Sequence, residues 1–135
     1  MADQPRQGTQ SSAGPDSPLA PYDFDLSPVI ESLRADPAWQ SGAAWRRLVH
    51  YPDFQIIVRA LRAGRRIDTH QNPGRICVQT IAGHIRMHAH DRMFDLPVGR
   101  LLVLDREVPH DVEAVDDSVF LLTVAAPEGA SPRPR

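Results

Sequence analysis

The spacing of apolar residues changes along the chain, from a helical period near the start to alternation after residue 54. Ser27 can cap a helix, and Val29, Ile30 and Leu33 then form an apolar stripe along one helix face. Asp36–Pro37 ends this stripe. We therefore expect one short helix, followed by a second short helical or irregular stretch over residues 38–45.

Beyond residue 54 the sequence is a series of short strand patterns separated by turn signals that contain Gly, Pro or Asp. The expected strands cover residues 54–61, 66–72, 75–81, 84–90, 101–105, 110–114 and 118–125. Many short strands with regular turns are typical of a β-sandwich or barrel. The predicted fold class is therefore all-β, a small antiparallel jelly roll with a short helical N-terminal segment.

Both ends of the chain differ in composition from its middle. Residues 1–21 and 127–135 are rich in Pro, Ser and Gly and contain few large apolar residues. Such segments cannot bury enough apolar surface to offset the entropy lost on ordering. We expect a flexible arm over 1–21, one domain over 22–126 with its barrel core at 54–125, and a flexible tail over 127–135.

Charge and composition exclude several classes of function. The net charge of −2 argues against a basic protein that binds nucleic acid, and no apolar run is long enough to cross a membrane. The polar N-terminus indicates no secretory signal, so we expect a cytoplasmic protein. Cys77 is the single cysteine, which excludes an internal disulfide and a cysteine zinc cage, and we expect a buried structural thiol. The sequence has no Lys, which excludes Schiff-base chemistry.

Two stretches of the strand region resemble the two signature motifs of the cupin superfamily, small β-barrels of the germin type. The first motif runs Gly, five residues, His-x-His, three or four residues, Glu, six residues, Gly. At these positions the chain has Gly64, His70, Asn72, Ile76 and Gly83. The spacing agrees throughout, but Asn72 replaces the second His and Ile76 replaces the Glu.

The second motif runs Gly, five residues, Pro-x-Gly, two residues, His, three residues, Asn. Here Gly99 is followed at these spacings by residues 105–107, by His110 and by Ala114. The Gly and the His are kept, whereas Asp-Arg-Glu replaces Pro-x-Gly and Ala114 replaces the Asn. Because neither stretch needs an insertion, the resemblance implies a cupin barrel.

The resemblance also implies a site inside the barrel. Members with the full pattern hold one divalent transition metal ion (Fe, Mn, Ni, Cu or Zn) through three His and one Glu. This chain keeps His70 and His110, and Asn72 could add an amide oxygen, whereas Ile76 cannot bind metal. One hypothesis is therefore a metal-binding cupin that acts on or senses a small molecule. The alternative is a metal-free cupin whose apolar pocket, lined by Ile76 and Val78, binds a small-molecule ligand.

Asp68 is a further candidate metal ligand. Alternation along a strand places residues 68, 70 and 72 on one face. Asp68 could then complete a set of two His and one carboxylate with His70 and His110. The other interpretation is that Asp68 lies at the rim, in water or paired with an arginine such as Arg65.

A second group of histidines follows the first motif. His84, Arg86, His88 and His90 alternate with apolar residues, so this stripe should face outward. His88 and His90 could together ligate an ion at the surface. Alternatively, the stripe could be a strand that faces solvent or a dimer partner. Alternation turns Gln79 away from the pocket, although a bulge could reverse it.

The aromatic residues ahead of the motifs and the exposed edge strands bear on packing and on the oligomeric state. We expect four aromatic residues ahead of the motifs to serve core or subunit packing: Trp39, Trp45, Tyr51 and Phe54. The sequence identifies no catalytic residue. The resemblance implies a homodimer. Exposed edge strands need to be covered, which is consistent with such a dimer.

Overall fold

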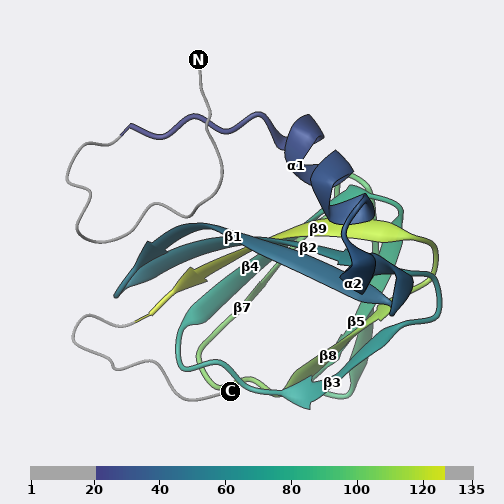
Figure 1. The fold of residues 1–135 in the computed structure, drawn as a ribbon. Coiled ribbons are helices and arrows are strands. Elements are labelled where there is room, and N and C mark those ends of the chain that lie inside the picture. The colour runs from purple at the N-terminus through teal and green to yellow at the C-terminus, as the bar shows by residue number, and fades with distance from the viewer. Residues whose placement is uncertain (1–20, 127–135) are drawn as a thin grey trace.

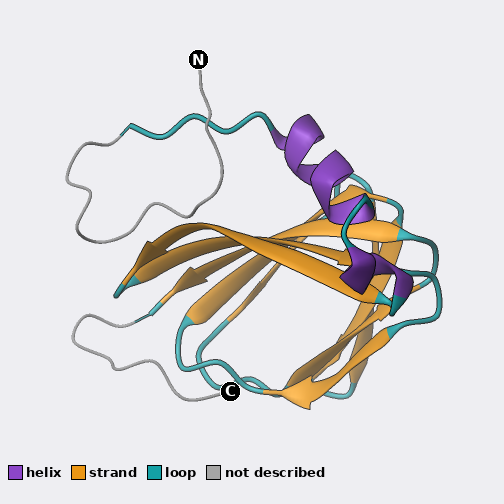
Figure 2. Ribbon diagram, in the orientation of Figure 1, coloured by secondary structure: helices purple, strands orange, loops and turns teal. Residues whose placement is uncertain are grey.

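The fold is seen in a computed structural model that describes residues 21–126. Two antiparallel sheets face each other, and two short helices lie on the outer side of one of them (Figures 1 and 2). The predicted tail over 127–135, and the predicted arm over 1–21 apart from Pro21, lie outside the described residues. Within those residues no helix is long and apolar enough to cross a membrane.

Nine strands and two helices make up the described fold. The helices are α1 (Leu26–Arg34) and α2 (Pro37–Gln40). The strands are β1 (Ala43–Tyr51), β2 (Phe54–Leu61), β3 (Arg66–His70), β4 (Arg75–Ala82), β5 (His84–Ala89), β6 (Arg92–Pro97), β7 (Leu101–Leu104), β8 (His110–Ala114) and β9 (Ser118–Ala125). The five-stranded sheet has the order β1-β2-β9-β4-β7, and the four-stranded sheet has the order β3-β8-β5-β6. This architecture confirms the predicted all-β jelly roll.

The helices begin at aspartates. Asp25 caps α1, and its carboxylate accepts a hydrogen bond from the backbone N–H of Ser27 at 3.2 Å, so Ser27 is not the cap. Asp36 caps α2 in the same way, through Ala38 at 2.9 Å. The apolar face of α1, with Leu33 fully buried, packs on the outer face of the five-stranded sheet.

The seven predicted strands are present, with ends that differ by at most two residues, and two strands were not predicted. β1 was missed because a bulge between Arg47 and Val49 breaks its alternation. The expected helical or irregular stretch over 38–45 is therefore wrong from Ala43 onward. β6 was missed because Leu96 is its only buried residue.

The main core lies between the two sheets. In β5, the alternation places Ile85, Met87 and Ala89 inward, where all three are buried. Phe120 of β9 meets them from the opposite sheet and is 1% exposed. Full burial of side chains of this size stabilises a fold by about 1.5–3 kcal/mol each. Part of the space between the sheets is not filled by this core, and the candidate site lies there.

Candidate functional site

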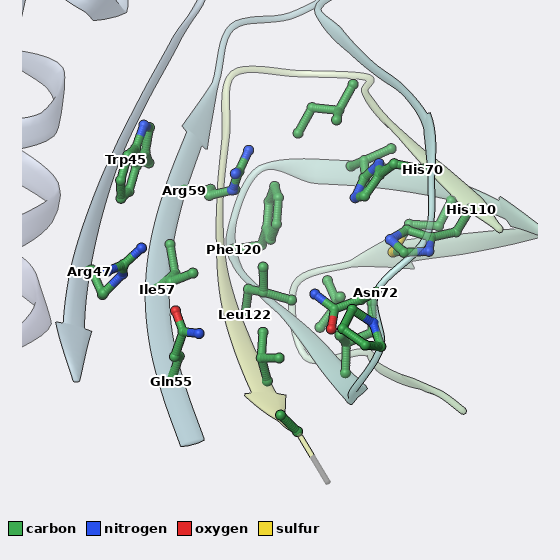
Figure 3. Close-up of a pocket in the computed structure, with 18 of the residues that line it drawn as sticks. Trp45, Arg47, Gln55, Ile57, Arg59, His70, Asn72, His110, Phe120 and Leu122 are labelled. Carbon is green, nitrogen blue, oxygen red and sulfur yellow. The ribbon is translucent and has the colours of Figure 1, made fainter. Parts of the chain in front are cut away.

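A cavity of about 500 Å³ opens between the two sheets. Its walls combine an apolar floor with a small number of polar side chains (Figure 3). The floor comes from both sheets and consists of Ile57, Ile67, Ile76, Val78, Met87, Val112, Phe120, Leu122 and Val124. Ile76 and Val78, the two residues singled out for an apolar pocket, are both part of it.

His70 and His110 meet at the wall formed by the four-stranded sheet. They are directly opposite each other in the β3–β8 pair, and their ring centroids are 4.3 Å apart with the rings tilted by 59°. Both line the cavity, His110 buried and His70 half-buried. Two histidines 40 positions apart in the sequence are therefore brought together at one site (Figure 3).

Each of these imidazoles is oriented by a backbone carbonyl two residues before it. His70 Nδ1 lies 2.9 Å from the oxygen of Asp68, and His110 Nδ1 lies 2.9 Å from the oxygen of Val108. A carbonyl oxygen only accepts hydrogen bonds, so Nδ1 must carry the proton in both rings. In the neutral ring, Nε2 is then the unprotonated nitrogen, which is the tautomer that ligates metals and accepts from hydroxyl groups.

Asn72 also lines the cavity, but its amide oxygen is used locally. Its Oδ1 accepts a hydrogen bond from the backbone N–H of Gly74 at 2.8 Å, in the turn before β4. The backbone oxygen of Asn72 accepts from the N–H of Glu107 at 2.8 Å, which ties the two motif segments together. Asn72 therefore shapes the loop beside the two histidines.

Asp68 does not face the cavity. A bulge shifts the β3–β8 register between Ile67 and His70, so Ile67 and His70 both point inward although they are three residues apart. Asp68 then lies on the outer side and is exposed. The expectation that it shares a face with His70 does not match this geometry. Among residues 21–126 no group of three or more His, Cys, Asp or Glu is placed to hold a metal ion.

The histidine stripe of β5 faces outward, as its alternation predicted. His88 Nδ1 lies 2.8 Å from the carboxylate of Asp111, which also accepts from Arg66 at 2.7 Å. His90 is exposed and takes a positive φ of 53° in the turn after β5, so it does not continue the face of His88. In the described fold, the other three members, His84, Arg86 and His88, belong to the outer surface of the four-stranded sheet.

Two further residues of β4 lie away from the cavity. Gln79 is exposed on the other side of the sheet, as regular alternation requires. Cys77 is on the same outer side and is half-buried rather than fully buried. Burial raises the pKa of its thiol above the usual value, which disfavours the nucleophilic thiolate.

The wall opposite the histidine pair was not found from the sequence. It is built by the inward faces of β1 and β2 and consists of Trp45, Arg47, His50, Gln55, Ile57 and Arg59. The bulge in β1 places both Arg47 and His50 on this face, although they are three residues apart. Arg47 Nη1 donates a hydrogen bond to His50 Nδ1 at 3.1 Å. The alternate positions 55, 57 and 59 of the predicted strand over 54–61 were the available signal.

Burial and the neighbouring Arg47 both affect the pKa of His50. Burial first, and the Arg47 charge second, lower the pKa of His50 from its ordinary value of 6.5. Since the lowered pKa belongs to the folded state, protonation favours unfolding, and stability should fall as the pH drops below 6.5. We expect NMR titration to give a pKa below 6.5, and Arg47→Gln to raise it. An unchanged pKa in the variant would contradict the contact.

No family model and no curated protein matches the sequence. A conserved protein of unknown function from Streptococcus pyogenes has a similar structure, with a TM-score of 0.63 and 29% identity over 67% of this chain and 79% of that one. A cupin superfamily protein from Desulfitobacterium hafniense gives a TM-score of 0.61 and 14% identity over 63% of this chain and 78% of that one.

An enzyme also shares the fold. A mutant of salicylate 1,2-dioxygenase from Pseudoaminobacter salicylatoxidans, in complex with gentisate, gives a TM-score of 0.68 and 17% identity. The match covers 76% of this chain but only 32% of the dioxygenase, so this chain corresponds to about a third of that protein. At this identity the likeness concerns the fold.

Proposed function

We propose that this chain, which has the cupin fold, binds a small molecule in the cavity between its two sheets, in contact with His70 and His110. The observation that carries the proposal is a cavity of about 500 Å³ with an apolar floor and a few convergent polar groups. Small-molecule sites in proteins have this size and this composition. The gentisate complex of the dioxygenase supports a small ligand for this fold.

The two imidazoles define what the ligand meets. Their Nδ1–H groups donate to backbone carbonyls, so in the neutral rings the Nε2 atoms carry the lone pairs. A ligand hydroxyl or amide N–H can donate to such a nitrogen, while the apolar part of the ligand packs on Phe120 and Leu122. The residues around the cavity would thus bind and orient a ligand that has a hydrogen-bond donor and an apolar body.

A divalent metal ion between His70 and His110 is the second candidate. Hydrogen bonds from Nδ1 to backbone carbonyls are the usual way in which metal-ligating histidines are oriented. The donor set is incomplete, however: Ile76 stands at the carboxylate position, Asp68 is exposed, and the Asn72 oxygen accepts from Gly74. Metal sites of the catalytic kind usually have three protein ligands. A bound metal would therefore need donors from the ligand or from water.

Analysis of the purified protein tests both candidates. The protein is purified without a His-tag, and its metal content and retained small molecules are measured by elemental analysis and native mass spectrometry. We expect His70→Ala/His110→Ala to lose the retained species, and His88→Ala/His90→Ala, which removes two imidazoles from the outer surface, to keep it. Metal that is lost only with His70 and His110 supports the metal-binding form, and a small molecule without metal supports the metal-free form. Retained species that are equal in all three proteins would contradict the proposal.

A further inference from the structure

Among residues 21–126, the charged side chains that line the cavity are all of one sign. Of the described residues that line it, Arg47 and Arg59 carry a positive charge and none is Asp or Glu. His50, His70 and His110 add imidazoles, which become positive if protonated. A cavity with low-dielectric walls and charges of one sign concentrates ligands of the opposite sign.

The two arginines are close neighbours on one sheet face. In the β1–β2 register Arg47 is opposite Ile57 and Trp45 is opposite Arg59, so Arg47 and Arg59 are diagonal neighbours. Their side chains point from the same side of the sheet into the cavity (Figure 3). An anion bound beside them is attracted by both positive charges.

Arg47 has hydrogen-bonding capacity to spare. Its Nη1 donates to His50, and its guanidinium lies 6.0 Å from the centre of the Trp45 ring. Its buried Nε has no hydrogen-bond partner among residues 21–126. A buried donor without a partner is costly, and a small rotation of the Arg47 side chain toward a ligand oxygen in the cavity would supply the missing acceptor.

We infer that the β1–β2 wall is a carboxylate subsite, and that the ligand is a small organic acid whose carboxylate binds at Arg47 beside Arg59. This inference rests on the proposed function, because it assigns the ligand class of the same cavity. The planar guanidinium matches the two oxygens of a carboxylate. The apolar body of the acid lies on Phe120 and Leu122, next to this wall (Figure 3). A singly charged carboxylate suits the apolar floor better than a doubly charged phosphate, which costs more to desolvate.

Matched probes that differ only in charge test this assignment. Benzoate and benzamide have nearly the same shape, and phenyl phosphate tests the other oxyanion. Trp45 lines the cavity and is 55% exposed, whereas Trp39 is a buried residue of α2 outside the cavity, so a binding-dependent change in tryptophan fluorescence reports on the cavity. Calorimetry gives the dissociation constants.

We expect wild-type protein to bind benzoate at least about 10-fold more tightly than benzamide, and more tightly than phenyl phosphate. Arg47→Gln should weaken benzoate binding by about 10- to 100-fold and leave benzamide binding nearly unchanged. Arg47→Lys keeps the charge and should restore part of the loss. Arg100→Gln removes an exposed arginine outside the cavity and should have no effect. Thermal unfolding of each variant confirms that it is folded.

Different results would reject the carboxylate subsite and the small-molecule cavity. Equal affinity for benzoate and benzamide, an Arg47→Gln effect of equal size on both, or a preference for phenyl phosphate would overturn the carboxylate subsite. If benzamide binding were then still lost in His70→Ala/His110→Ala, the small-molecule cavity would stand. If neither benzoate nor benzamide bound, the carboxylate subsite would be rejected, and unchanged retained species in the histidine variants would reject the cavity as well.

Discussion

Gly83→Ala is expected to destabilise the fold by about 3–5 kcal/mol. Gly83 joins β4 of one sheet to β5 of the other, with a φ of +80°. A Cβ at this position would lie 2.2 Å from the backbone oxygen of Asp117 and 2.7 Å from the Cα of Ser118. Backbone atoms cannot move aside as a flexible side chain can. Urea unfolding of the variant and of the wild-type protein measures the difference in the free energy of unfolding.

Gly64→Ala is the matched control for this prediction. Gly64 also has a positive φ, +85°, but a Cβ there would meet nothing within 4 Å. Its cost should therefore be the conformational one alone, about 1–2 kcal/mol. Equal losses at both glycines would show that crowding at the β4–β5 corner is not what the fold depends on.

Phe120→Ala is expected to cost about 3–5 kcal/mol of unfolding free energy. The side chain is 1% exposed, and it belongs both to the core between the sheets and to the cavity floor. Its removal leaves a space that the rigid sheets can fill only in part. The same urea measurement determines the loss.

Phe54→Ala removes the same ring from a place where it is 39% exposed. We expect this control to cost only about 1–2 kcal/mol, because more than a third of the residue is already in contact with water. If Phe120→Ala cost no more than Phe54→Ala, the packing of the two sheets against each other would differ from the one described.

The sequence predicted most of the strands because one face of each is buried, so apolar residues alternate along it. It failed where that alternation breaks. In β1 the bulge after Arg47 places two consecutive residues, Leu48 and Val49, on the same buried side, and this hides the strand period. In β6 too few residues are buried for any period to be visible.

The candidate site was predicted in part for the same reason. His70 and His110 were found because motif spacing survives even where the surrounding residues differ. Asp68 was placed wrongly because alternation was assumed to continue through the bulge of β3. Arg47 and His50 were missed because their common face exists only through the bulge of β1. No local pattern in a single sequence marks such an inserted residue.

Histidine-selective ¹⁵N NMR tests the central claim, that His70 and His110 contact a ligand in the cavity between the sheets. The account predicts the Nδ1–H tautomer for both rings, and a shift of both Nε2 signals when benzamide is added, because its amide N–H can donate to them, while the exposed His90 stays unchanged. Unmoved Nε2 signals at saturating benzamide, or shifts confined to the outer histidines, would contradict it.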